Sequence, residues 1–145
     1  MIVYAESSAV LAWLMGESNE PLVRVALDGA DRVVTSSLTA LECARGLTRA
    51  KLAGRISTMQ ELATLRVLDD AESTWDVHVL TDGVVARARA TFPVEPVRTL
   101  DALHLATALV LQEATGPLAV LSFDGRVRAN AIALGFAVLP PHTTT

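Results

Sequence analysis

The chain has 145 residues, 51% of them hydrophobic and 19% charged, and its formal net charge is −4. This balance favours one compact domain, expected over 1–139 with a disordered tail at 140–145, and it excludes a protein that coats nucleic acid with a broad basic surface. The single cysteine, Cys43, excludes an internal disulfide framework. The N-terminal sequence does not resemble a secretory signal, and the most apolar stretch is too short to cross a bilayer, so we expect a cytoplasmic protein.

The first half of the chain alternates short β-branched runs with helical patterns. IVYA at 2–5 predicts a buried strand, and SAVLAWLM at 8–15 predicts a helix that ends at Gly16. Pro21 suits the first turn of a second short helix, and RVVT at 32–35 predicts the next strand. Two further helices are expected as a hairpin, over 38–53 and from residue 57 onward.

The second half continues the alternation. WDVHVL at 75–80 predicts a strand, Thr81 is a candidate cap for the helix that follows, and 92–97 is expected to be a loop. The remaining predicted elements are a helix at 100–113, a strand at 118–122, a helix at 126–134 and a strand at 136–139. This rhythm predicts an α/β fold of three layers, with a central, mostly parallel sheet of four to five strands flanked by helices.

Four acidic residues stand where predicted strands give way to helices: Glu6, Glu42, Asp101 and Asp124. The carboxyl ends of parallel strands share one edge of the sheet, and ligands bind there. We therefore expect all four carboxylates to face one cleft. Such a set repels itself unless a proton or a cation intervenes, which points to a divalent metal.

Each acid also has a purely structural interpretation. Thr39 and Glu42 have the spacing of a capping box, Asp101 suits the positive end of a helix dipole, and Asp124-Gly125 is a common turn dipeptide. Glu6 resists such an explanation, because a carboxylate directly after an apolar strand is expected to be partly buried and to need a partner.

Oxygen ligands with few histidines favour Mg²⁺ or Mn²⁺ over zinc, and such a site suits hydrolysis of a phosphodiester. We interpret Asp101 and Asp124 as metal ligands, Glu6 as a ligand or bridging acid, and Glu42 as a ligand through water or as the group that positions the nucleophile. Ser7, Ser8 and Ser122 would orient the carboxylates. His104 lies on the same helical face as Asp101, and we interpret it as a hydrogen-bonded core histidine.

The helix after Glu42 carries candidate contacts to the phosphates of a nucleic acid. Arg45 and Arg49 would form a stripe that leads away from the acids along one helix face. Trp13 and Trp75 fit core packing better than base stacking.

The surroundings of the acids resemble those of PIN-domain ribonucleases, specifically the VapC-type toxins of toxin–antitoxin pairs. The matching segments are IVYAESSAVLAWL, TSSLTALECARGL, TLDALHLATAL and AVLSFDGRVRANAIALG. The resemblance implies a PIN-like fold and a metal-dependent endoribonuclease that cleaves RNA. It also implies a homodimer held inactive by a VapB-type antitoxin whose basic segment can enter the acidic cleft. The dimer and antitoxin surfaces are then expected on the first helix, with Val10, Leu11 and Leu14, and on the hairpin at 38–70.

One residue departs from the family pattern, in which the first acid is usually aspartate and here is Glu6. Mg²⁺ tolerates little distortion of its octahedral geometry, so the extra methylene bears on metal affinity and rate. A second hypothesis is therefore a PIN-fold module of weak or lost catalysis that binds a protein partner or RNA. A third, a phosphate-accepting receiver or phosphatase domain, ranks lower because it requires a lysine or paired aspartates at the cleft, whereas the only lysine is Lys51.

Overall fold

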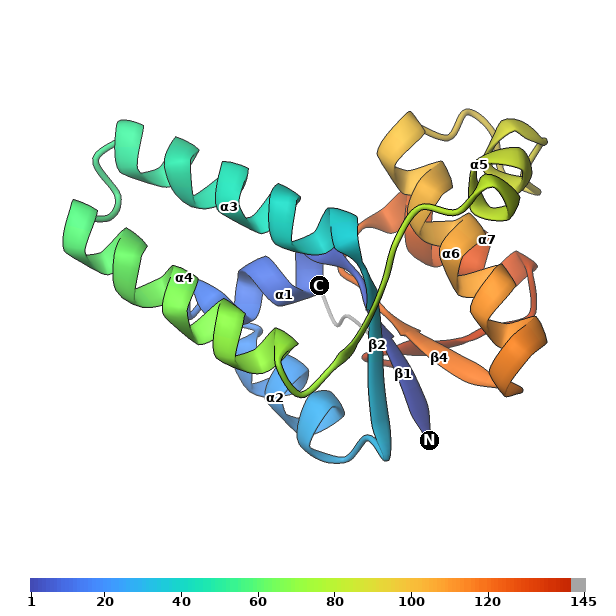
Figure 1. Ribbon diagram of the computed structural model, residues 1–145, viewed down its shortest axis with the longest axis horizontal. Helices are drawn as coiled ribbons and strands as arrows, with labels where there is room; N and C mark the ends of the chain where they lie inside the picture. Colours follow the sequence, from blue (N-terminus) through green and yellow to red (C-terminus); the bar gives the residue numbers. More distant parts are fainter. Residues whose placement is uncertain (142–145) are drawn as a thin grey trace.

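The computed structural model describes residues 1–141, which form seven helices and one five-stranded sheet (Figure 1). The strands are β1 (Ile2–Ala5), β2 (Arg32–Ser36), β3 (Asp76–His78), β4 (Leu118–Leu121) and β5 (Ala137–Leu139). The helices are α1 (Ser7–Leu14), α2 (Glu20–Asp28), α3 (Ser37–Leu52), α4 (Thr58–Glu72), α5 (Asp82–Arg89), α6 (Thr99–Thr115) and α7 (Gly125–Ala133). The predicted order of strands and helices is confirmed, and residues 142–145 of the predicted tail lie outside the described residues.

All strand pairs are parallel, and the strand order is β3-β2-β1-β4-β5. β1 therefore lies in the centre, where the order reverses between β2 and β4, and this switch point is where open α/β sheets bind ligands. Receiver domains have the order 2-1-3-4-5 instead, and Lys51 is paired with Glu61 at 2.8 Å between α3 and α4. The receiver hypothesis is therefore wrong.

Helices cover both faces of the sheet. In Figure 1, α1 to α4 lie on one side of the strands, and α5 to α7 lie on the other. Alternation along β1 supplies both cores, because Tyr4 packs against the side formed by α6 and α7, whereas Val3 and Ala5 face the α1 side. The three-layer arrangement predicted from the sequence is confirmed, with the sheet entirely parallel. None of the helices within residues 1–141 has the length and apolarity needed to cross a bilayer.

Two expected features differ in the structure. The strand expected at 75–80 covers only 76–78, because β3 is an edge strand that pairs with three residues of β2. The capping box at Thr39 and Glu42 is wrong: Ser36 caps α3 by accepting a hydrogen bond from the Leu38 amide. The position of Glu42, one and a half turns into the helix, is thus not explained by capping.

Candidate active site

The switch point brings the ends of β1 and β4 side by side. Ala5 pairs with Leu121, and the Glu6 amide donates a hydrogen bond to the Leu121 carbonyl at 3.0 Å. Glu6 and Ser122 are the next residues of the two strands, so strand register alone makes them neighbours. α1 and α3 begin at the same edge, directly after β1 and β2.

Glu6 is buried at this edge, with 4% of its surface exposed. Its Oε2 accepts hydrogen bonds from the Ser122 hydroxyl at 2.7 Å, from the Ser8 amide at 3.1 Å and from the Ser8 hydroxyl. The hydrogen bond from the Ser8 amide to Glu6 also caps the N-terminus of α1. The sequence-based expectation that Glu6 is buried and partnered is confirmed, and Ser8 and Ser122 are the side chains that orient it.

Glu42 is hydrogen-bonded by Ser7, the neighbour of Ser8. The Ser7 hydroxyl donates to Glu42 Oε1 at 2.8 Å, and His104 Nε2 lies 2.5 Å from the same oxygen. Burial raises the Glu42 pKa, but the hydrogen bonds from His104 and from the Ser7 hydroxyl, together with the charge of Arg98, outweigh it, so this pKa lies below its usual value. Glu42 is therefore ionised at neutral pH.

Asp101 and Asp124 are bridged by one guanidinium. Arg98 Nε donates to Asp101 at 2.8 Å, and its terminal nitrogen donates to Asp124 at 2.9 Å. Asp101 is 6% exposed, in the first turn of α6, while Asp124 caps α7 by accepting from the Arg126 and Val127 amides. Both aspartates thus have structural roles of the kind the sequence suggested, in addition to facing the acids.

A single hollow of about 170 Å³ unites the four acids. Its lining residues are Glu6, Ser7, Ser8, Leu11, Glu42, Arg49, Arg98, Asp101 and Asp124. The prediction that acids from four separate segments face one cleft is therefore confirmed. Sequence reasoning missed Arg98 and the contact between His104 and Glu42, although both residues stand three positions from Asp101 on its helix face, a spacing that indicates proximity.

The acids are not gathered around one point. Within residues 1–141, no three His, Cys, Asp or Glu side chains are close enough together to hold a metal ion as they stand. The reasons are visible in the contacts: Oε2 of Glu6 is turned to the serines, and Arg98 draws Asp101 and Asp124 to itself. An all-oxygen donor set is of the kind that Mg²⁺ and Mn²⁺ prefer, and Arg98 is paired with two of these carboxylates.

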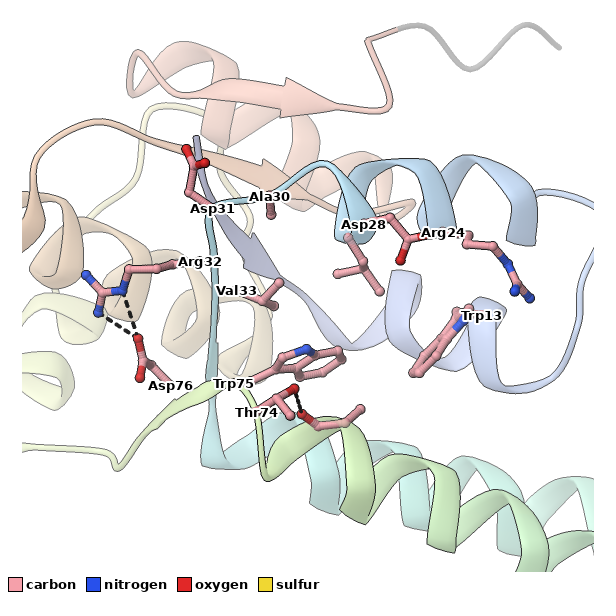
Figure 2. A pocket seen from close by; sticks show the side chains of 12 residues that line it. Trp13, Arg24, Asp28, Ala30, Asp31, Arg32, Val33, Thr74, Trp75 and Asp76 are labelled. Atoms are coloured by element: carbon pink, nitrogen blue, oxygen red, sulfur yellow. Dashed lines mark hydrogen bonds and ion pairs between the residues drawn. The ribbon is translucent and has the colours of Figure 1, made fainter.

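A larger cavity lies away from the acids, at the opposite end of the strands. It has a volume of about 540 Å³ and includes Trp13 and Trp75, whose ring centroids are 6.1 Å apart. Figure 2 shows both indoles between α2 and the end of α4, beside the ion pair of Arg32 and Asp76. Both tryptophans pack against the α1-side core, as expected, and each also forms part of this cavity wall.

The chain is similar to several known proteins. A family model described as "PIN domain" matches residues 3–133. Ribonuclease VapC35 of Mycobacterium tuberculosis is 28% identical over 142 residues, which cover 97% of each chain. Ribonuclease VapC46 of the same species is 32% identical over 139 residues, covering 96% of this chain and 97% of the relative. A solved toxin–antitoxin complex from Klebsiella pneumoniae has a similar fold, with a TM-score of 0.66 and 16% identity over 98% of this chain and 99% of that one.

Proposed function

Since this chain belongs to the PIN-domain family and to its VapC-type ribonucleases, we propose that it is a metal-dependent endoribonuclease and the toxin of a toxin–antitoxin pair in the cytoplasm. The observation that carries the proposal is the hollow in which four acids from four chain segments meet at the switch point of a parallel sheet. An acidic hollow attracts a hard cation, and a cation is what allows an acidic site to accept a phosphodiester.

Glu6, Asp101 and Asp124 would hold Mg²⁺ or Mn²⁺ between the ends of β1, β4 and α6. Such a cation, when bound, activates water and neutralises charge on the phosphate. Glu42 would position the attacking water, because its carboxylate is ionised and held on one oxygen by Ser7 and His104. The water oxygen bonds to phosphorus and gives up one proton, the bond from phosphorus to the leaving oxygen breaks, and the leaving oxygen takes up one proton, so that the net reaction is hydrolysis.

The RNA path is proposed along α3. Glu42, Arg45 and Arg49 line one hollow of about 400 Å³, and both arginines are exposed. Arg49 also lines the acidic hollow. The two guanidiniums therefore extend from the acids along one helix face, where each would contact a phosphate flanking the cleaved bond.

The cleavage assay that tests the proposal uses labelled RNA, purified protein and Mn²⁺. Asp101→Asn should abolish cutting, because it removes a buried ligand, whereas Asp69→Asn, at an exposed acid on α4, should leave cutting unchanged. EDTA should stop the reaction. Cutting that survives EDTA or Asp101→Asn would contradict the proposal.

A second candidate is a PIN-fold module that binds a protein or RNA without cleaving it. The observation that favours it is the engagement of Glu6 by Ser8 and Ser122 together with the bridge of Arg98. In this case, the folded protein would retain RNA or partner binding while no RNA is cut at any Mn²⁺ concentration.

We propose that the antitoxin binds at the cavity lined by Trp13 and Trp75 and at a neighbouring hollow. A second hollow of about 310 Å³ shares Trp13 and Arg24 with this cavity and includes Val67 of α4, which is 47% exposed. Val10, expected at a partner surface, is 0% exposed, so that part of the expectation is wrong. Val67→Glu should prevent copurification with a co-expressed antitoxin, while Ile132→Glu, exposed on α7, should not.

A homodimer is proposed through the outer face of α3. Leu41 and Leu52 are 59% and 80% exposed on this helix, and Leu41 and Leu100 both line the hollow that Arg45 and Arg49 also line. Exposed apolar side chains that adjoin one another are typical of interfaces, so the dimer contact would lie beside the RNA path. Leu41→Glu should shift the sedimentation of the protein from dimer to monomer, and a monomeric wild-type protein would contradict the proposal.

A further inference from the structure

His104 is buried within the acid network. It lies on α6, one turn after Asp101, and is 1% exposed. Its ring makes contacts at both nitrogens: Nδ1 is 2.7 Å from the Tyr4 hydroxyl, and Nε2 is 2.5 Å from Glu42 Oε1 and 2.9 Å from the Ser7 hydroxyl. A histidine placed only for packing has no need of a carboxylate partner drawn from a different helix.

The two ends of this chain of contacts determine where the ring carries its proton. At one end, the Tyr4 hydroxyl lies 2.7 Å from Nδ1 and is a donor whose hydrogen bond an unprotonated Nδ1 can accept. At the other end, ionised Glu42 can only accept, so the nitrogen beside it must carry a hydrogen. Both ends select the neutral ring protonated at Nε2.

We propose that Tyr4 and His104 position Glu42 for catalysis by presenting its carboxylate with one fixed N–H donor. The role rests on the proposed ribonuclease function and deepens it. Tyr4 holds the ring edge-on, with ring centroids 6.0 Å apart and an interplanar angle of 74°. The ring then directs Nε2–H at the same oxygen that Ser7 contacts, which fixes the carboxylate rotamer of Glu42.

The two neighbouring serines contact different acids. The Ser7 hydroxyl lies within hydrogen-bond distance of Glu42 and His104, whereas the Ser8 amide donates to Glu6. Removal of His104 leaves Ser7 as the sole side-chain hydrogen-bond donor to Glu42 among the described residues. Glu42 would then sample several rotamers, so the reaction step should slow while RNA binding, which depends on α3, persists.

The kinetic test compares His104→Leu, His104→Gln and Leu105→Val. His104→Leu should lower kcat by about 10- to 100-fold, the range for partners that orient reactive groups, with KM unchanged within about twofold. His104→Gln keeps an N–H donor and should recover most of kcat. Leu105→Val is the control for core packing, because Leu105 is equally buried on the same helix and has no link to Glu42.

Nitrogen-15 NMR of the histidine side chains provides a readout independent of activity. The wild-type protein should show His104 as the Nε2–H tautomer, and Tyr4→Phe, which removes one oxygen, should mix the tautomers and lower kcat. Should His104→Leu fail to fold, Tyr4→Phe and His104→Gln still decide the question.

Two results would overturn the inference: an Nδ1–H tautomer in the wild-type protein, or a kcat for His104→Leu equal to that of Leu105→Val. A wild-type protein that cuts no RNA would instead remove the proposed function, and the tautomer measurement would then decide alone whether the ring orients Glu42.

Discussion

Arg98 offsets part of the negative charge in the acidic hollow. It is 60% exposed on its side chain, yet it contacts two aspartates of which one is almost fully buried. The hydrogen bond to Asp101, together with the charges of Asp101 and Asp124, raises the Arg98 pKa. An exposed arginine that bridges two proposed metal ligands competes with the cation for the same oxygens.

Arg98→Gln should therefore tighten Mn²⁺ binding. Loss of the competing guanidinium frees Asp101 and Asp124, so the affinity for Mn²⁺ should rise by roughly three- to tenfold. Calorimetric titration of Mn²⁺ without RNA measures it. Arg89→Gln, at an exposed arginine on α5, is the control. Weaker Mn²⁺ binding by Arg98→Gln would show that Arg98 supports the cation site instead.

The charge of Glu42 should make part of the stability depend on pH. Its folded pKa lies below the usual value of 4.5, so the stabilisation is complete above about pH 4.5 and is lost as the pH falls through the folded pKa. Glu42→Gln should be less stable than the wild type at pH 7, and this gap in the free energy of unfolding should narrow below pH 4.5.

Urea unfolding at several pH values from 7 to 3 measures the gap. Glu113→Gln, at an exposed carboxylate near the end of α6, should follow the wild-type curve throughout. A gap for Glu42→Gln that stays constant down to pH 3 would mean that the contacts of Ser7 and His104 do not favour the charged form.

Among the helices, α3 combines an acid of the hollow, two exposed arginines and a packed inner face. Its first turns present Glu42 to the hollow, its middle carries Arg45 and Arg49, and its inner face is close-packed. Gly46 permits this packing, because a Cβ there would lie 2.8 Å from a methyl of Leu11, which itself lines the acidic hollow. The helix position relative to α1 is thus coupled to the shape of the site.

The arginine stripe predicts a salt dependence. Arg45→Gln and Arg49→Gln should each weaken RNA binding and lower the slope of log affinity against log salt by about one. Fluorescence anisotropy in EDTA, where RNA is not cut, measures both quantities. Arg66→Gln, at an exposed arginine on α4, should change neither. Equal slopes for all three variants would move the RNA path off α3.

Elements were easier to predict than contacts. Strand β1 and helix α1 were predictable because IVYA is a β-branched, apolar run and the residues after it follow a helical period. The bridge of Arg98 to Asp124 spans 26 residues, and the Tyr4–His104 bond spans 100. No local pattern encodes such pairs, and they depend on strand register. Val10 was misplaced because an apolar stripe looks the same whether it faces a core or a partner.

For the molecule as a whole, the reactivity of the buried Cys43 is a probe of unfolding. It is 0% exposed between α1 and α4, and burial, with the charges of Glu42 and Glu6, raises its pKa to about 12. A thiol that is both inaccessible and protonated does not react. Its modification therefore requires the helices around it to separate.

Thiol labelling of the native protein at pH 8 should be more than about a hundredfold slower than in the urea-unfolded chain. The rate should rise with urea along the equilibrium unfolding curve, because only the open chain reacts. Rapid labelling without urea would indicate that α3 separates from the core locally, and the acidic hollow would then be a mobile site.

We propose that Glu6, Asp101 and Asp124 hold a divalent cation at the switch point of the sheet. Diffraction from crystals soaked in Mn²⁺, recorded for the anomalous signal of manganese, would locate this cation. We expect an anomalous peak within ligand distance of Asp101 and Asp124, with Arg98 moved away from both carboxylates. A peak elsewhere, or Arg98 still bridging the two aspartates at saturating Mn²⁺, would contradict it.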